Sequence, residues 1–167
     1  GVSATAIAGE GTGMERDYDG DSKVYGSDLR DPEAIGREAG ERAVRRLNPG
    51  RLPTGRGTVV FDPRLASSLV GHLLGAINGA AIARRTSFLQ NALGTALFAP
   101  SIRITDDPRR PRGLASRPFD GEGVAAEPMD LVAGGVLQTW LLDSATAREL
   151  GLETNGRGSG GGGSPHA

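Results

Sequence analysis

The chain has 167 residues and a formal net charge of −1, so bulk electrostatics argue against nucleic acid and acidic lipid as partners. It contains no cysteine, which excludes disulfide bonds and thiolate metal sites within these residues and fits a reducing cytoplasm. With 27 glycines and 4% aromatic residues, the sequence predicts a core of small and aliphatic side chains.

The first 26 residues predict a β-hairpin. Residues 2–8 alternate like a strand, residues 9–13 have the composition of a turn, and residues 14–19 fit a return strand. The G-x-G-x-G pattern in the turn is a weak match to a phosphate-binding loop. It lacks the Gly-Lys-Ser/Thr that holds phosphate and magnesium, so a hairpin turn is the favoured interpretation.

Residues 31–47 predict an amphipathic helix. Asp31 is a suitable N-cap and Pro32 suits the first turn. One face is apolar, at Ile35, Ala39, Ala43, Val44 and Leu47. Arginines lie on the opposite face, but two glutamates are interleaved with them, which favours a solvated surface over a nucleic-acid interface.

The rest of the chain alternates between short strands, helices and one long loop. We expect strands at 58–61, 99–105, 124–128 and 136–142, and helices from 63 to about 84 and from 143 to 150. Three prolines predict a long loop over 106–123, and long loops inside compact domains are often functional. The Gly/Ser-rich residues 158–167 predict a flexible tail.

The uncharged run from Leu65 to Ala83 is long enough to span a bilayer. His72 and Asn78 lie within it, and such polar groups are unfavourable in lipid without partners. Three glycines, at Gly71, Gly75 and Gly79, also weaken a helix there. A buried helix of a soluble protein is favoured, and the four-residue glycine spacing predicts close approach of another backbone.

His72 is a poor metal-ligand candidate on the residues alone. Zinc needs at least three protein ligands, yet the only other histidine is His166, and no acidic residue lies between Asp62 and Asp106. Ser68 and His72 are one helical turn apart, like a nucleophile and its base, but no acid is placed to orient the imidazole. A structural histidine is therefore the favoured interpretation.

Two long segments of the chain closely resemble the TldD/PmbA family, in the branch called PmbA, TldE or modulator of DNA gyrase. The first begins at "DPEAIGREAGERAVRRLNPG" and ends at "RPFDGEGV". The second is "GGVLQTWLLDSATARELGLETNGR". The resemblance covers nearly all of residues 1–157. Chains of the family are more than twice this long, so the resemblance implies an internal portion of a longer chain. The sequence starts at Gly1 and shows no n-region, h-region or cleavage pattern of a signal peptide, which fits that expectation.

The resemblance implies a heterodimeric cytoplasmic metallopeptidase that trims or degrades unstructured peptides. Its TldD-type subunit carries H-E-x-x-x-H on a helix, with both histidines on zinc and the glutamate as general base. Aligned with this sequence, the motif falls on Ser67, Ser68 and His72. Serine replaces neither imidazole on zinc nor carboxylate as a base. We therefore expect no catalytic residue and no metal in this chain, and zinc in the partner subunit.

The loop residues Arg117, Asp120 and Glu122 are candidates for an edge of the peptide channel. They combine irregular backbone with clustered charge, which suits binding of an extended peptide. An ordinary surface loop, satisfied by its own salt bridges, is the equally open alternative.

The expected fold class is α+β, with helices packed on a mixed or antiparallel sheet that leads into a mostly antiparallel, barrel-like C-terminal domain. Residues 1–62 are expected to end an N-terminal α/β region. Residues 63–157 are expected to begin the C-terminal domain with the glycine-spaced helix.

The expected function is a non-catalytic PmbA/TldE-type subunit that contributes dimerisation and peptide binding to a TldD-type catalytic partner, with a homodimer left open. One rival is an active metallopeptidase, which needs ligands from outside these residues. Another is a gyrase- or DNA-associated regulator, which the near-neutral charge and the lack of a DNA-binding motif disfavour. Neither nucleic acid nor membrane is an expected partner.

Overall fold

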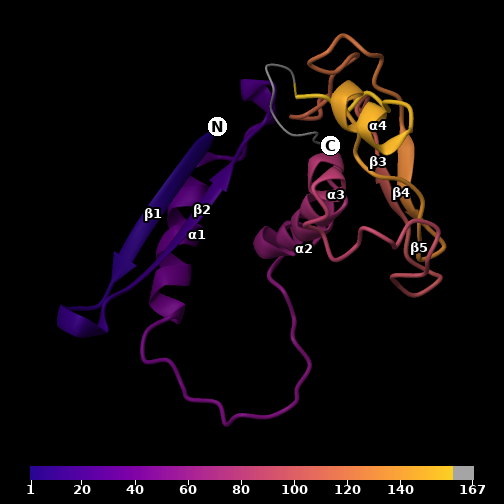
Figure 1. Cartoon of the computed structure of the whole chain (residues 1–167). Helices are drawn as coiled ribbons and strands as arrows, with labels where there is room; N and C mark the ends of the chain where they lie inside the picture. The colour runs from indigo at the N-terminus through magenta and orange to yellow at the C-terminus, as the bar shows by residue number, and fades with distance from the viewer. Residues whose placement is uncertain (160–167) are drawn as a thin grey trace. The chain divides into compact units, whose positions relative to one another are not determined.

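The computed structural model describes residues 1–159 (Figure 1). The chain forms two compact units, one of Gly1–Val59 with Arg112–Leu114 and one of Val60–Pro111 with Ala115–Ala167. Residues 160–167, which hold His166 and most of the predicted tail, lie outside the described part.

The first unit is a β-hairpin packed on a helix. Strands β1 (Val2–Ala8) and β2 (Glu15–Asp21) pair antiparallel, in a register that sets Val2 opposite Asp21. Helix α1 (Pro32–Arg45) begins where the Asp31 side chain accepts a hydrogen bond from the Glu33 N–H at 3.2 Å. The predicted hairpin and helix are confirmed, and the return strand runs two residues further than expected.

Helix α1 packs on the hairpin through small apolar residues and buried charge. Ile35, Ala39 and Ala43 are at most 1% exposed. Asp19 on β2 is 3% exposed and lies 2.8 Å from a guanidinium nitrogen of Arg30. A buried carboxylate needs such a partner because isolated charge is costly to desolvate.

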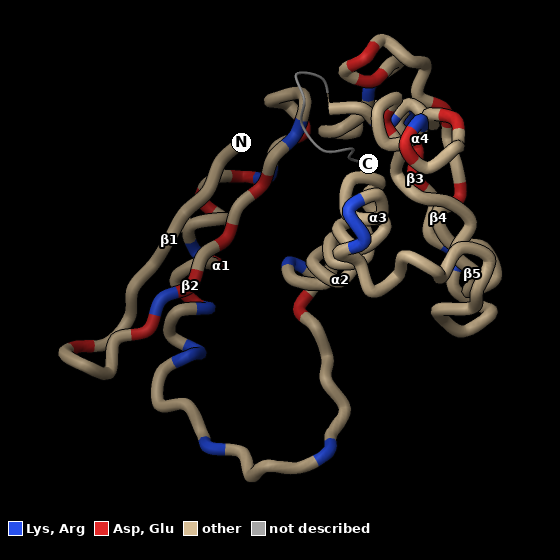
Figure 2. The backbone as a smooth tube through the Cα atoms, viewed as in Figure 1, with Lys and Arg blue, Asp and Glu red and all other residues tan. Residues whose placement is uncertain are grey.

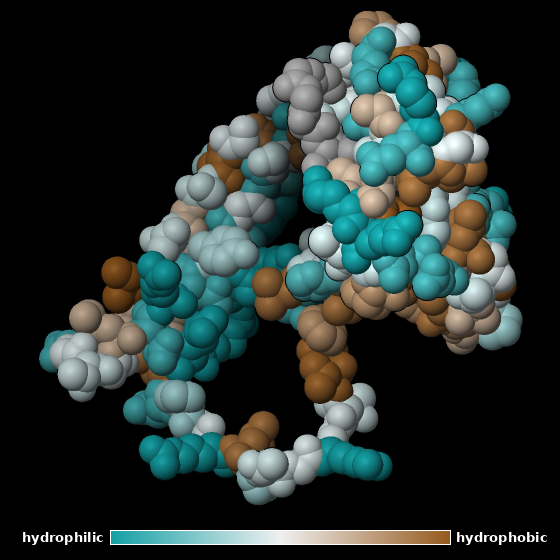
Figure 3. All heavy atoms as spheres, in the orientation of Figure 1, coloured by the Kyte–Doolittle hydropathy of each residue, from teal (hydrophilic) through white to brown (hydrophobic). Residues whose placement is uncertain are grey.

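The linker of residues 48–62 contains no helix or strand, so the strand predicted at 58–61 is wrong. Val59 and Val60 are 72% and 89% exposed. Figure 3 shows hydrophobic atoms along this part of the chain. β-Branched residues favour extended backbone, but a strand also needs a neighbouring strand to receive its hydrogen bonds, and the described residues supply none here.

The second unit begins with two helices, α2 (Pro63–Ala76) and α3 (Gly79–Ala83), where one continuous helix was predicted. Asn78 separates them. Its backbone is extended, with φ −65° and ψ 127°, and its side chain accepts a hydrogen bond from the Ala80 N–H at 3.0 Å. The same residue forms a backbone bridge with Leu141. The chain therefore leaves the helix to make a tertiary contact and starts a new helix with its own cap.

The sheet of the second unit has the order β3-β4-β5 and is antiparallel. Its strands are β3 (Ile104–Asp106), β4 (Met129–Ala133) and β5 (Val136–Leu137). β3 and β5 are shorter than the strands predicted at 99–105 and 136–142, and the strand expected at 124–128 lies five residues later, at β4. The predicted mixture of helices and antiparallel sheet is confirmed. Neither sheet closes on itself in the described residues, so the predicted barrel-like domain is not supported.

The core of the second unit joins the helices to this sheet. Ile77, Leu131, Val132, Leu137 and Leu141 are all at most 2% exposed. Helix α4 (Ser144–Leu150) follows, as predicted, from a capping box in which Asp143 and Thr146 exchange hydrogen bonds. Within residues 1–159, no helix is long and apolar enough to cross a membrane.

Candidate functional site

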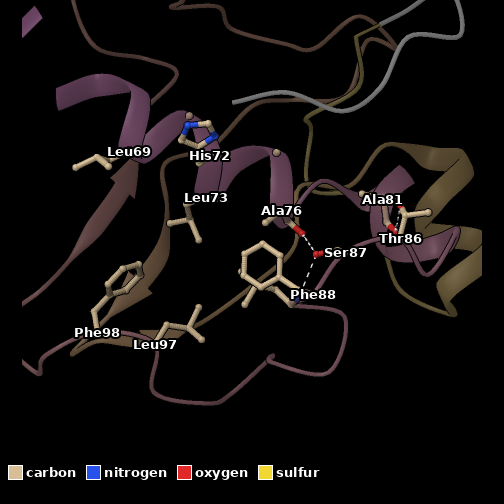
Figure 4. Close-up of a pocket in the computed structure, with 13 residues that line it drawn as sticks. Leu69, His72, Leu73, Ala76, Ala81, Thr86, Ser87, Phe88, Leu97 and Phe98 are labelled. Atoms are coloured by element: carbon tan, nitrogen blue, oxygen red, sulfur yellow. Dashed lines mark hydrogen bonds between the residues drawn. The ribbon is translucent and has the colours of Figure 1, made fainter. Parts of the chain in front are cut away.

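A pocket of ≈ 900 Å³ lies beside the second half of α2 (Figure 4). Leu73 and Ala76 of α2 lie on one side, and Phe88, Leu97 and Phe98 lie opposite them. Most of the lining side chains are apolar. A pocket of this size and lining is typical of sites that bind small molecules or peptide side chains.

Ser87 holds one wall of the pocket against the end of α2. Its hydroxyl donates a hydrogen bond to the Ala76 carbonyl at 2.6 Å and accepts one from the Leu89 N–H at 3.0 Å. Ser87 itself is 8% exposed, whereas its neighbour Phe88 is 86% exposed. These two bonds therefore place a large aromatic side chain at the mouth of the pocket.

The three positions of the degenerate metal motif lie on α2, and all are exposed. His72 lines the pocket. The Ser68 hydroxyl donates to the carbonyl of Leu65 in its own helix at 2.6 Å. Two hydroxyls and one imidazole do not fit zinc, which takes imidazole, thiolate and carboxylate ligands. Among the described residues, no three His, Asp or Glu side chains come close enough to hold a metal ion.

The three spaced glycines have different surroundings. A Cβ on Gly79 would lie 2.6 Å from the Leu141 carbonyl oxygen and 2.7 Å from the Thr146 hydroxyl. Gly71 and Gly75 line the pocket, and a Cβ on either would meet nothing within 4 Å in the described structure. Because the helix is interrupted after Ala76, Gly79 belongs to a different helix from the other two.

Asp120 organises the loop between β3 and β4 from within. It is 3% exposed and accepts hydrogen bonds from three backbone N–H groups, those of Glu122 (2.9 Å), Val124 (2.9 Å) and Gly158 (2.7 Å). Burial raises the pKa of this carboxyl, but the three N–H donors outweigh that effect and hold the pKa below its ordinary value. These bonds occupy Asp120 inside the loop.

Glu122 and Arg117 also make contacts within the second unit. A carboxylate oxygen of Glu122 accepts from the Ser144 N–H at 2.8 Å, at the start of α4. Arg117 lines a separate pocket of ≈ 300 Å³ between 108 and 118. None of the three loop candidates lines the α2 pocket. The contacts of Asp120 and Glu122 favour the ordinary-loop interpretation, and a role for Arg117 in a channel stays a prediction.

Arg157 is a buried residue that sequence analysis missed. Its side chain is 0% exposed, pairs with Asp106 at 2.5 Å, and donates to the carbonyls of Glu127 and Asn155 at 2.8 Å. The next residue, Gly158, is also buried. The glycine-rich composition predicted a tail here, and the single arginine among small residues was the only sign of a structural role.

Comparison with known proteins identifies the two units of the chain. Residues 54–167 match the PmbA/TldA metallopeptidase C-terminal domain and residues 1–47 match its central domain. Metalloprotease PmbA of Escherichia coli O157:H7 is 40% identical over 159 residues, which are 95% of this chain and 35% of that protein. A PmbA homolog of Buchnera aphidicola is 36% identical over 90% of this chain and 34% of its own length. The chain spans about a third of these curated relatives.

Solved structures agree with this assignment. A proposed modulator of DNA gyrase from Bacteroides thetaiotaomicron has a TM-score of 0.86 at 33% identity, over 95% of this chain and 36% of that one. TldE from Thermococcus kodakarensis, at 23% identity and a TM-score of 0.62 over 96% of this chain and 37% of that one, shares the fold. The sequence and structural comparisons together establish that this chain belongs to the TldD/PmbA family of metallopeptidases.

Proposed function

We propose that the chain is part of a non-catalytic, PmbA/TldE-type subunit of a heterodimeric metallopeptidase that degrades or processes unstructured peptides. One observation carries the proposal. The helix that would bear a zinc motif has hydroxyls at Ser67 and Ser68, and only His72 retains a group that binds zinc. The partner, a TldD-type subunit, supplies the zinc and the general base.

The α2 pocket is the part of this subunit that we assign to peptide binding. It is open and mostly apolar, so it suits an apolar side chain of an extended peptide. Gly71 and Gly75 present no Cβ toward it, which leaves room for a peptide backbone to approach α2 closely.

The absence of cysteine fits a complex that works in the reducing cytoplasm.

The proposal is tested with the full-length protein and a TldD-type subunit, alone and mixed, in the presence of zinc. Cleavage of an unstructured peptide is followed by mass spectrometry. We expect cleavage in the mixture only, and its loss when the partner's motif glutamate is replaced. Chelator-sensitive cleavage by the PmbA-type protein alone would overturn the proposal. Size-exclusion chromatography of each sample reports whether homodimers form.

A variant of the pocket tests the peptide-binding role. Gly75→Ala adds one methyl group to the lining without a clash in the described structure. We expect the variant mixture to keep its assembly and to bind peptide several-fold more weakly. Unchanged affinity would remove the α2 pocket from the peptide path.

A further inference from the structure

Helix α3 ends in a backbone conformation that is unusual for its sequence. Arg85 has φ 57°, and the N–H groups of Arg85 and Thr86 bond to the carbonyls of Ile82 and Ala81, both at 3.0 Å. This is a Schellman helix end, in which glycine normally occupies the left-handed position. An arginine there is disfavoured, and such outliers concentrate at functional sites.

Arg84 and Arg85 are both exposed, and neither makes an ion pair or side-chain hydrogen bond with any residue that the structure describes. No acidic residue occurs in the sequence between Asp62 and Asp106, so every segment that lines the pocket lacks a counter-charge of its own. Figure 2 shows this positive stretch beside α3. Within residues 1–159 these two guanidinium groups have no anionic partner, so they are available to bind one.

The arginines do not line the α2 pocket themselves, but they lie in the sequence between two residues that do. Ala81 precedes them on α3 and Thr86 follows them directly, and both line the pocket. Phe88, two residues further along, is the exposed aromatic residue at its mouth. The two arginines are therefore adjacent in sequence to the pocket lining, where the next residue of a bound, extended peptide would pass.

We propose that Arg84 and Arg85 select peptides that carry a carboxylate next to an apolar residue. The proposal rests on the proposed function, since it specifies which unstructured peptides the pocket accepts. A guanidinium group binds a carboxylate through two parallel, charge-assisted hydrogen bonds. The carboxylate belongs either to an acidic side chain or to the C-terminus of the peptide, because both present the same group.

Binding of fluorescein-labelled, unstructured peptides to the full-length protein tests the inference by fluorescence anisotropy. Four peptides share one Leu and differ in the next residue, Glu or Gln, and in a free or amidated C-terminus. We expect the peptide whose carboxylate meets the arginines to bind on the order of tenfold more tightly than the matching peptide in which that carboxylate is replaced by an amide. The Glu/Gln pair reports on side chains and the acid/amide pair on the C-terminus. The preference weakens with added salt.

Arg85→Gly is the informative variant because glycine fits the left-handed position without strain. We expect it to melt at no lower temperature than the parent and to lose most of the carboxylate preference, whereas Arg85→Lys retains part of it. Arg148→Ala is the matched control, since Arg148 is exposed on α4 and does not line the pocket. It leaves the preference unchanged.

Equal affinity for all four peptides overturns this inference, as does a preference that survives Arg85→Gly combined with Arg84→Ala. Both results leave the proposed function intact as long as the mixture with the TldD-type subunit cleaves peptide. Absence of cleavage by that mixture is the separate result that defeats the proposed function. No detectable binding of any peptide overturns the inference outright.

Discussion

Gly75 and Gly79 allow the same substitution to be made in two different environments. A methyl group on Gly79 meets the backbone oxygen of Leu141, which has little freedom to move, whereas Gly75 faces open space in the described structure. We expect Gly79→Ala to lower the free energy of unfolding by about 1–3 kcal/mol. Gly75→Ala is expected to raise it by roughly 0.5–1 kcal/mol, because alanine is the better helix former.

Urea unfolding of the full-length protein without peptide measures both effects. Equal losses at the two positions would contradict the expectation and would mean that another segment of the longer chain packs on Gly75. That result would restore the close-packing role that the glycine spacing predicted there.

Asp120 makes stability depend on pH in a defined direction. Its pKa in the folded state lies below the ordinary value near 3.8 because three N–H donors outweigh the effect of burial. A lowered pKa means that the carboxylate stabilises the fold fully above its unfolded-state pKa, and that this stabilisation is lost as pH falls through the folded-state pKa. The difference in unfolding free energy between the parent and Asp120→Asn should therefore be constant near neutrality and shrink below about pH 4. A difference that stays constant down to pH 2 would contradict this assignment.

At the scale of elements, the break between α2 and α3 depends on Asn78. Its side chain caps α3, and loss of an N-cap typically costs about 1 kcal/mol. We expect Asn78→Ala to reduce the free energy of unfolding by about that amount, and Asn78→Asp to retain most of it because aspartate also caps. Unchanged stability in Asn78→Ala would show that the backbone bridge with Leu141, which side-chain replacement leaves in place, sets the break rather than the cap.

The elements that sequence analysis predicted correctly carry local signals. Asp31 and Asp143 each precede a helix as a cap, and the hairpin alternates along its whole first strand. The elements that it missed depend on distant residues. Asn78 ends a helix because it meets Leu141, and residues 58–61 form no strand because none of the described strands lies beside them.

The candidate site also has parts that the local sequence predicts and parts that depend on distant residues. The position of the degenerate motif follows from its sequence, since residues 67, 68 and 72 lie on one short helix. The pocket wall does not, because Ser87 reaches it through a bond to Ala76, eleven residues earlier. Arg157 was missed because its partner Asp106 is 51 residues away, and composition alone carries no information about that pairing.

At the scale of the whole molecule, the linker of residues 48–62 is the expected site of first proteolysis. Every residue in it is exposed and none belongs to a helix or strand. The first compact unit gives way to the second between Val59 and Val60, inside this linker. The match to the family's central domain ends at residue 47, and the match to its C-terminal domain begins at residue 54. Brief trypsin treatment should cut after Arg51 and Arg56 first, and mass spectrometry of a time course identifies the fragments. Cleavage at Arg42 or Arg157, which are half-buried and buried, is expected later. Early cleavage at either would contradict the assignment.

The buried contacts of Arg157 and Gly158 also set an order of events during synthesis. Gly158 bonds to Asp120 across 38 residues, and at 5–20 residues per second the ribosome needs about 2–8 s to add them. Throughout that interval Asp106 lacks its partner Arg157, and Asp120 lacks the Gly158 N–H, the last of its three backbone donors to be made. The hairpin and α1 have no such dependence, because every residue of that assembly lies within the first 45. The hairpin and α1 can therefore pair and pack while the second unit is still being translated, and the loop closes last.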